Sequence, residues 1–182
     1  TTMPRLRHIP YGIALACLLA GGYGALHDQV SYTISPEYFT VTKFAQFHIA
    51  DALHNRIGAA LVGWLASWWM GLVLGIVLVP LALLLPGERG AWPTVVRAEL
   101  TALGTAAVVG LAAVLLSWLV IGGDVIEEGW LPTDLVHPAA YARVAMIHAW
   151  SYAGGLAGLI VALAGVVVSH WVVRGQGSRV SW

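Results

Sequence analysis

The chain has 182 residues, of which 59% are hydrophobic and only 10% are charged, and its nine basic and nine acidic side chains balance. Soluble domains carry about 25% charged residues, so this composition excludes an ordinary soluble enzyme and indicates an integral membrane protein. The sequence has no cluster of basic residues of the kind that binds nucleic acids. The single cysteine, Cys17, excludes a disulfide framework and a cysteine metal motif.

Four long runs without Asp, Glu, Lys or Arg predict four transmembrane helices. A helix rises about 1.5 Å per residue, so about 20 residues cross a hydrocarbon core of about 30 Å. The longest run, Ile57 to Gly87, exceeds that length. We therefore expect one all-α domain over residues 1–182, a transmembrane four-helix bundle with helices at about 10–26, 43–85, 94–121 and 138–173.

The first predicted helix begins at Pro10, because proline suits a first helical position, and it ends before His27. The segment that follows contains Ser35, Pro36 and Glu37 in succession. A capping hydroxyl, a proline and an acid in the first turn are typical of a helix start. We expect a short helix there, at the membrane interface.

The second predicted helix, 43–85, is longer than one membrane crossing, so its first turns should project outward. That projecting part is polar and contains His48, Asp51 and His54 at spacings of three residues. Residues three apart share one face of a helix. The sequence therefore predicts one face that carries two imidazoles and a carboxylate.

The third predicted helix is rich in Ala, Val and Leu, whereas the fourth begins at His137 and Pro138 with a polar head that includes His148. Gly154, Gly155 and Gly158 follow. Small residues at this spacing let two membrane helices approach closely. We expect these glycines to contact a neighbouring helix, a partner membrane subunit or a second copy of the chain.

The charges are distributed unevenly between the two predicted membrane faces. The face with both termini and the loop near 86–99 carries six arginines and two acids, whereas the opposite face carries three basic and seven acidic residues. Positive charge accumulates on the cytoplasmic side. We therefore expect both the N- and the C-terminus in the cytoplasm.

Five of the seven histidines, and several acids, fall in the exterior half of the predicted bundle. Imidazole and carboxylate are the usual ligands of zinc and non-haem iron, and imidazole also suits copper. We predict a site for such a divalent transition metal built from His48, Asp51 and His148, with further candidate ligands at His54 and His27, and with Asp51 or Glu37 as ligand or catalytic base.

Two alternatives remain open for these residues. The histidines and acids could instead form an ordinary hydrogen-bonded rim at the membrane surface. A pair of histidines, His48 or His54 with His148, could also hold haem b. The sequence does not decide between them.

The segments His27–Thr40 and Met146–Gly155 resemble those of an uncharacterised group of bacterial multipass membrane proteins. The resemblance implies a protein of the bacterial inner (cytoplasmic) membrane, and it implies no activity. The leading hypothesis is a metal-binding membrane protein, and its more specific form is a metalloenzyme that acts on a membrane-associated substrate. The alternatives are a structural or assembly subunit of a respiratory or photosynthetic complex, and a carrier or sensor gated by histidine protonation.

Overall fold

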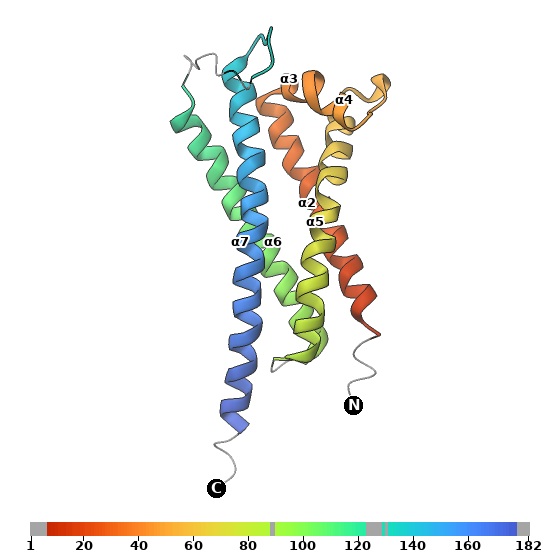
Figure 1. Cartoon of the computed structure of the whole chain (residues 1–182), viewed down its shortest axis with the longest axis vertical. Helices are drawn as coiled ribbons and strands as arrows, with labels where there is room; N and C mark the ends of the chain where they lie inside the picture. The colour runs from red at the N-terminus through yellow and green to blue at the C-terminus, as the bar shows by residue number, and fades with distance from the viewer. Residues whose placement is uncertain (1–6, 88–89, 123–128, 130, 178–182) are drawn as a thin grey trace.

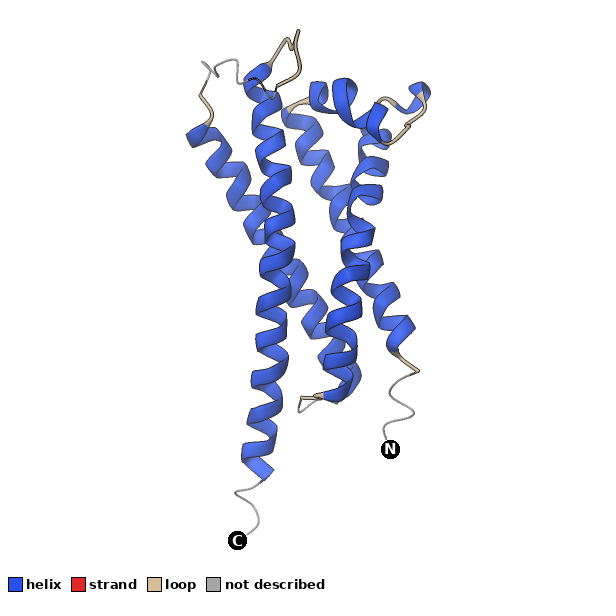
Figure 2. Cartoon of the chain, viewed as in Figure 1, coloured by secondary structure: helices blue, strands red, loops and turns tan. Residues whose placement is uncertain are grey.

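The computed structural model describes residues 7–87, 90–122, 129 and 131–177, and this part of the chain is all-helical (Figure 2). Its four long helices are α2 (Ile9–Ile34), α5 (Arg56–Leu84), α6 (Ala91–Val120) and α7 (Pro138–Gly177). Each is long and apolar enough to cross a membrane. The predicted class, an all-α protein with four membrane-length helices, is confirmed.

The four helices form two tightly packed pairs, α2 with α5 and α6 with α7, and the two pairs touch each other at few places (Figure 1). Glycines allow the close approach within a pair. A Cβ atom on Gly63 of α5 would lie 2.2 Å from the backbone oxygen of Gly24 in α2. The weaker contact between the pairs leaves room for a cavity along the bundle.

The three predicted glycine contacts lie inside the bundle. A Cβ atom on Gly158 would meet the backbone oxygen of Ala102 in α6, and one on Gly154 would meet Val109. Gly155 faces Met70 of α5. The close helix contact is confirmed, but all three glycines are buried within this chain, so they are not an external surface for a partner subunit or a second copy.

The start of α2 and the end of α7 lie at one end of the molecule, and the segment between α2 and α5 covers part of the other (Figure 1). This segment contains α3 (Pro36–Tyr38), the π-helix η1 (Phe39–Lys43), α4 (Phe44–Gln46) and the 3-10 turn η2 (Asp51–Leu53). The Ser35 hydroxyl accepts a hydrogen bond from the Tyr38 backbone N–H, as a helix cap does. The helix start predicted there is confirmed.

Two predicted helix boundaries differ from the structure. The first helix continues to Ile34, because its polar residues pack inside the bundle, where Asp28 is 2% exposed. The second begins at Arg56 and not near residue 43. The chain breaks at His48, which has a left-handed φ of 53°, and Asn55 caps the new helix by accepting from the Ile57 N–H.

Candidate metal centre

Two histidines and an aspartate from α2 and α7 meet below the segment that joins α2 to α5. Asp28 Oδ1 lies 3.2 Å from His27 Nδ1 and 3.3 Å from His148 Nε2. One potential ligand atom from each residue lies within 4.8 Å of the others, so the group could hold a metal ion. Because Asp28 precedes the end of α2 by six residues, the cluster lies about 9 Å inside that helix end, at a rise of about 1.5 Å per residue.

The cluster is shielded from solvent. The exposed fractions of the side chains are 11% for His27, 3% for Asp28 and 14% for His148. Asp28 Oδ2 is buried and has no hydrogen-bond partner among the residues that the structure describes. A buried carboxylate is costly unless a cation or hydrogen-bond donors compensate its charge, so the geometry favours a positive charge at this site.

The Ser151 hydroxyl holds the His27 ring in place. Ser151 Oγ lies 2.8 Å from His27 Nε2 and 2.9 Å from the Ile147 carbonyl oxygen. A hydroxyl has one proton, so it donates either to the carbonyl or to the ring. When it donates to the carbonyl, Nε2 carries the ring proton, and Nδ1 of a neutral His27 presents its lone pair to Asp28 Oδ1 at 3.2 Å. That tautomer suits a metal ion or a proton between the two atoms.

Aromatic side chains cover the cluster on the side of the joining segment. The ring centroid of Tyr38 lies 5.0 Å from that of His148, and the centroid of Phe39 lies 6.3 Å from it. Phe39 is fully buried, and burial also raises the pKa of the Tyr38 phenol, so this ring stays neutral. Tyr38 and Phe39 therefore form an apolar cover that separates the histidines from solvent.

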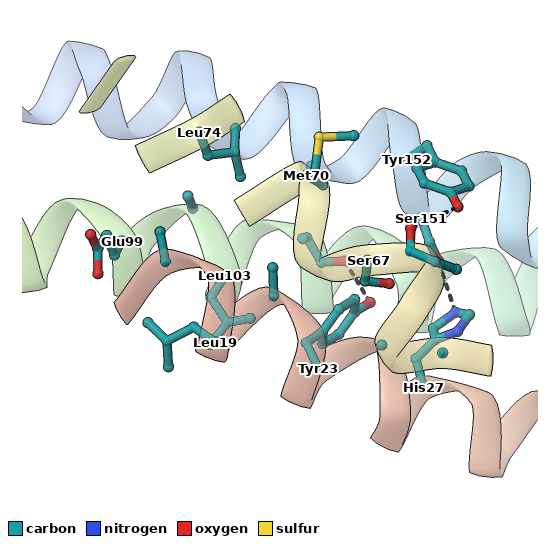
Figure 3. A pocket seen from close by; sticks show the side chains of 18 of the residues that line it. Leu19, Tyr23, His27, Ser67, Met70, Leu74, Glu99, Leu103, Ser151 and Tyr152 are labelled. Atoms are coloured by element: carbon teal, nitrogen blue, oxygen red, sulfur yellow. Dashed lines mark hydrogen bonds between the residues drawn. The ribbon is translucent and has the colours of Figure 1, made fainter. Parts of the chain in front are cut away.

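On its other side the cluster opens into a cavity between the two helix pairs (Figure 3). Its volume, counted as the space that the centre of a water molecule can reach, is about 90 Å³. One water needs about 10–15 Å³ by this measure, so the cavity holds several waters or a slender ligand. Its lining includes His27, Asp28 and His148 at one end and Glu99 of α6 at the other.

The structure places the other predicted ligands elsewhere. His48 is exposed, and the Asp51 side chain is fully exposed at 102%. His54 stacks on Phe44, with 4.5 Å between ring centroids, and its Nε2 lies 3.0 Å from the Ile49 carbonyl oxygen. Asp51 Oδ1 and His54 Nε2 approach to 3.6 Å. Within the described residues, however, neither His48, Asp51 nor His54 belongs to a group of three that could hold a metal, because the helix expected to align all three does not form.

The histidine pair expected for haem is likewise not assembled. His148 faces His27, with 5.2 Å between ring centroids, and not His48 or His54. Its Nε2 lies 3.2 Å from Ser31 Oγ and 3.3 Å from Asp28 Oδ1. The structure therefore favours an ion or a proton over a porphyrin at His148.

Glu37 has a structural partner that the sequence did not reveal. Its two carboxylate oxygens accept the backbone N–H groups of Val136 and His137, at 2.6 and 2.8 Å. These amides lie at the start of α7, where a helix has unpaired N–H groups and a favourable dipole for anions. Glu37 therefore joins the segment after α2 to α7, and it takes no part in the cluster around Asp28.

Asp28 is the member of the cluster that sequence reasoning did not select as a ligand. It was assigned to a loop beyond the first helix, and its neighbour His27 was the candidate. The available signal was the pair His27-Asp28 followed by Ser31, since positions 28 and 31 share a helix face.

In comparisons with known proteins, no family model, no curated protein and no solved structure matches this chain.

Proposed function

We propose that this chain is a metal-binding membrane protein that holds one divalent transition metal ion between His27, Asp28 and His148. The observation that carries the proposal is the convergence of two imidazole nitrogens on a buried carboxylate oxygen. Two histidines and one carboxylate are the protein ligands of many zinc and non-haem iron sites.

The spacing of these atoms suits zinc. Zinc binds nitrogen and oxygen at about 2.0–2.2 Å with tetrahedral geometry, so neighbouring ligand atoms lie about 3.3 Å apart. The two separations that involve Asp28 Oδ1, 3.2 and 3.3 Å, match that value, and all three ligand atoms lie within 4.8 Å of one another. The Ser151 contact with His27 Nε2 supports metal binding too, because metal-bound histidines commonly donate their second ring N–H to a fixed acceptor.

Three protein ligands leave a fourth position for water or substrate, as in catalytic zinc sites. All three residues line the cavity, so that position is open to whatever the cavity contains. Asp28 Oδ2 could accept a hydrogen bond from such a water. This arrangement favours a metalloenzyme with a membrane-associated substrate over a purely structural metal site.

We also propose that the protein belongs to the bacterial inner membrane and that both termini are cytoplasmic. The distribution of arginine along the sequence supports this orientation, because most arginines lie in or next to the start of α2, the start of α6 and the end of α7. The metal centre then lies in the half of the bundle that faces the periplasm, below the apolar cover of Tyr38 and Phe39.

Elemental analysis of purified protein after growth with added zinc and iron tests the metal site. We expect about one metal ion per chain in the wild type, and its loss in His27→Ala, Asp28→Asn and His148→Ala. The matched controls are His48→Ala and His54→Ala, which remove exposed histidines outside the cluster and should retain the metal.

Two results would overturn the proposal. One is a wild-type protein without stoichiometric metal under these conditions. The other is metal loss in His48→Ala together with retention in Asp28→Asn, which would restore the site predicted from the sequence.

A further inference from the structure

The cavity between the helix pairs has a second polar end that the metal site does not use. Glu99 of α6 is 4% exposed, and both of its carboxylate oxygens are buried without a hydrogen-bond partner among the described residues. In Figure 3 this carboxylate lies at the end of the cavity opposite His27 and Ser151. A carboxylate in this environment requires a cation, a proton or a donor from outside the chain.

The middle of the cavity is apolar. The side chains of Leu19, Met70, Leu74 and Leu103 lie between the two polar ends (Figure 3). Along α2 the lining runs from Ala16 to Asp28, which is about 18 Å at a rise of about 1.5 Å per residue. A long apolar cavity with a few polar groups at its ends is typical of a binding site for a molecule with an apolar body.

The charges of the lining indicate the head group of that molecule. Glu99 and Asp28 are the acidic residues of the lining, and within the described chain no lysine or arginine lines the cavity. His27 lies at the far end from Glu99 (Figure 3), and the His148 ring centroid is 5.2 Å from that of His27. A carboxylate in an apolar site without a protein cation attracts a cationic donor more strongly than a neutral one.

We infer that the cavity binds an amphiphilic amine from the bilayer, with its ammonium group paired to Glu99 and its apolar chain between Leu19, Leu74 and Leu103. This inference goes beyond the proposed metal site, because it assigns a ligand class to the opposite end of the cavity. It does not depend on a bound metal ion.

Binding of two probes with the same chain length tests the charge preference. Purified protein in lipid nanodiscs is equilibrated with radiolabelled dodecylamine or dodecan-1-ol, and empty nanodiscs correct for partition into lipid. We expect saturable binding of one dodecylamine per chain, about tenfold or more tighter than dodecan-1-ol, because an ion pair adds to the same apolar contact.

Three variants locate the site. Glu99→Gln keeps the shape of the side chain and should abolish the preference for the amine. Leu103→Trp fills the apolar middle of the cavity and should abolish saturable binding of both probes. His148→Ala should lose the metal yet still bind dodecylamine, so a failure of the metal proposal is distinguished from a failure of this one.

The inference is overturned if the wild type shows no saturable dodecylamine binding, or if it binds the amine and the alcohol equally well. It is also overturned if Glu99→Gln keeps the wild-type preference for the amine. Thermal unfolding of each variant, followed by circular dichroism, checks that a loss of binding is not a loss of fold.

Discussion

The imidazole of His27 and the hydroxyl of Ser151 join the two helix pairs of the bundle, with 2.8 Å between Nε2 and Oγ. His27 lies on α2 and Ser151 on α7, and these two helices have little direct contact elsewhere. The contact orients the ring so that Nδ1 faces Asp28, and when the hydroxyl donates to the Ile147 carbonyl this nitrogen presents a lone pair. The serine thus prepares the histidine to bind a cation.

Substitution of Ser151 by alanine should weaken metal binding without removing a ligand. Loss of such an outer partner typically lowers metal affinity about 10–100-fold, because the ring can then rotate or change its protonated nitrogen. Competition with a chromophoric chelator measures the affinity. The matched control is Ser169→Ala on the same helix, whose hydroxyl also donates to a backbone carbonyl, that of Val166. Equal affinities for wild type and Ser151→Ala would contradict the role assigned to this hydroxyl.

Substitution of Glu37 by alanine should destabilise the start of α7 and leave the metal content unchanged. The carboxylate accepts two backbone N–H groups there, and loss of a capping acceptor costs about 0.5–2 kcal/mol. Amide hydrogen exchange should become faster around residues 136–141 and stay the same in α5. Loss of metal with unchanged exchange would instead support the ligand or base role predicted from the sequence.

The four-helix architecture could be predicted because it depends on one property, the length of uncharged apolar segments, which can be read along the chain. The boundaries could not be predicted equally well. Hydropathy assigns polar residues to the outside, so His27 and Asp28 ended the first predicted helix. In the structure both are enclosed by α7 and continue the helix. Only the tertiary contact shows that their polar groups are paired inside the bundle.

Two of the predicted ligands, His27 and His148, do meet, and they could be named because both lie near the exterior ends of their helices. The structure does not bring them together with His48 and Asp51, because that grouping assumed a continuous helix through residue 48. A left-handed φ at His48 breaks that helix. Asn55, which caps the observed start of α5, is a typical capping residue and can be recognised in the sequence. The apolar pattern around it gave no reason to prefer a helix start there over one near residue 43.

Lys43, the only lysine of the chain, should react with amine reagents at a lower pH than an exposed lysine does. Burial lowers the pKa of Lys43 from its ordinary value of 10.5, although attraction to Asp28 partly opposes the shift. The unfolded chain therefore binds this proton more tightly, so the stability of the fold rises as pH increases from the lowered pKa towards 10.5. Mass spectrometry of the labelled peptide across a pH series measures the titration.

Asp28→Asn provides the internal control for Lys43. In the metal-free protein, removal of the negative charge of Asp28 should make the Lys43 pKa fall further, and labelling should begin at a still lower pH. A wild-type midpoint at or above 10.5 would show that the lysine is less desolvated than its half-buried position in the structure implies.

Alanine at Gly63 should separate α2 from α5, whereas alanine at Gly165 should not harm the fold. A Cβ atom at Gly63 would lie 2.2 Å from the backbone oxygen of Gly24, and backbone cannot move aside as a flexible side chain can. A Cβ atom at Gly165 of α7 meets nothing within 4 Å, so there alanine removes only the helix penalty of glycine, about 0.5–1 kcal/mol. Thermal unfolding in one detergent should rank Gly165→Ala at or above the wild type and Gly63→Ala well below it. Equal stabilities of the two variants would mean that the α2–α5 contact is looser than the structure shows.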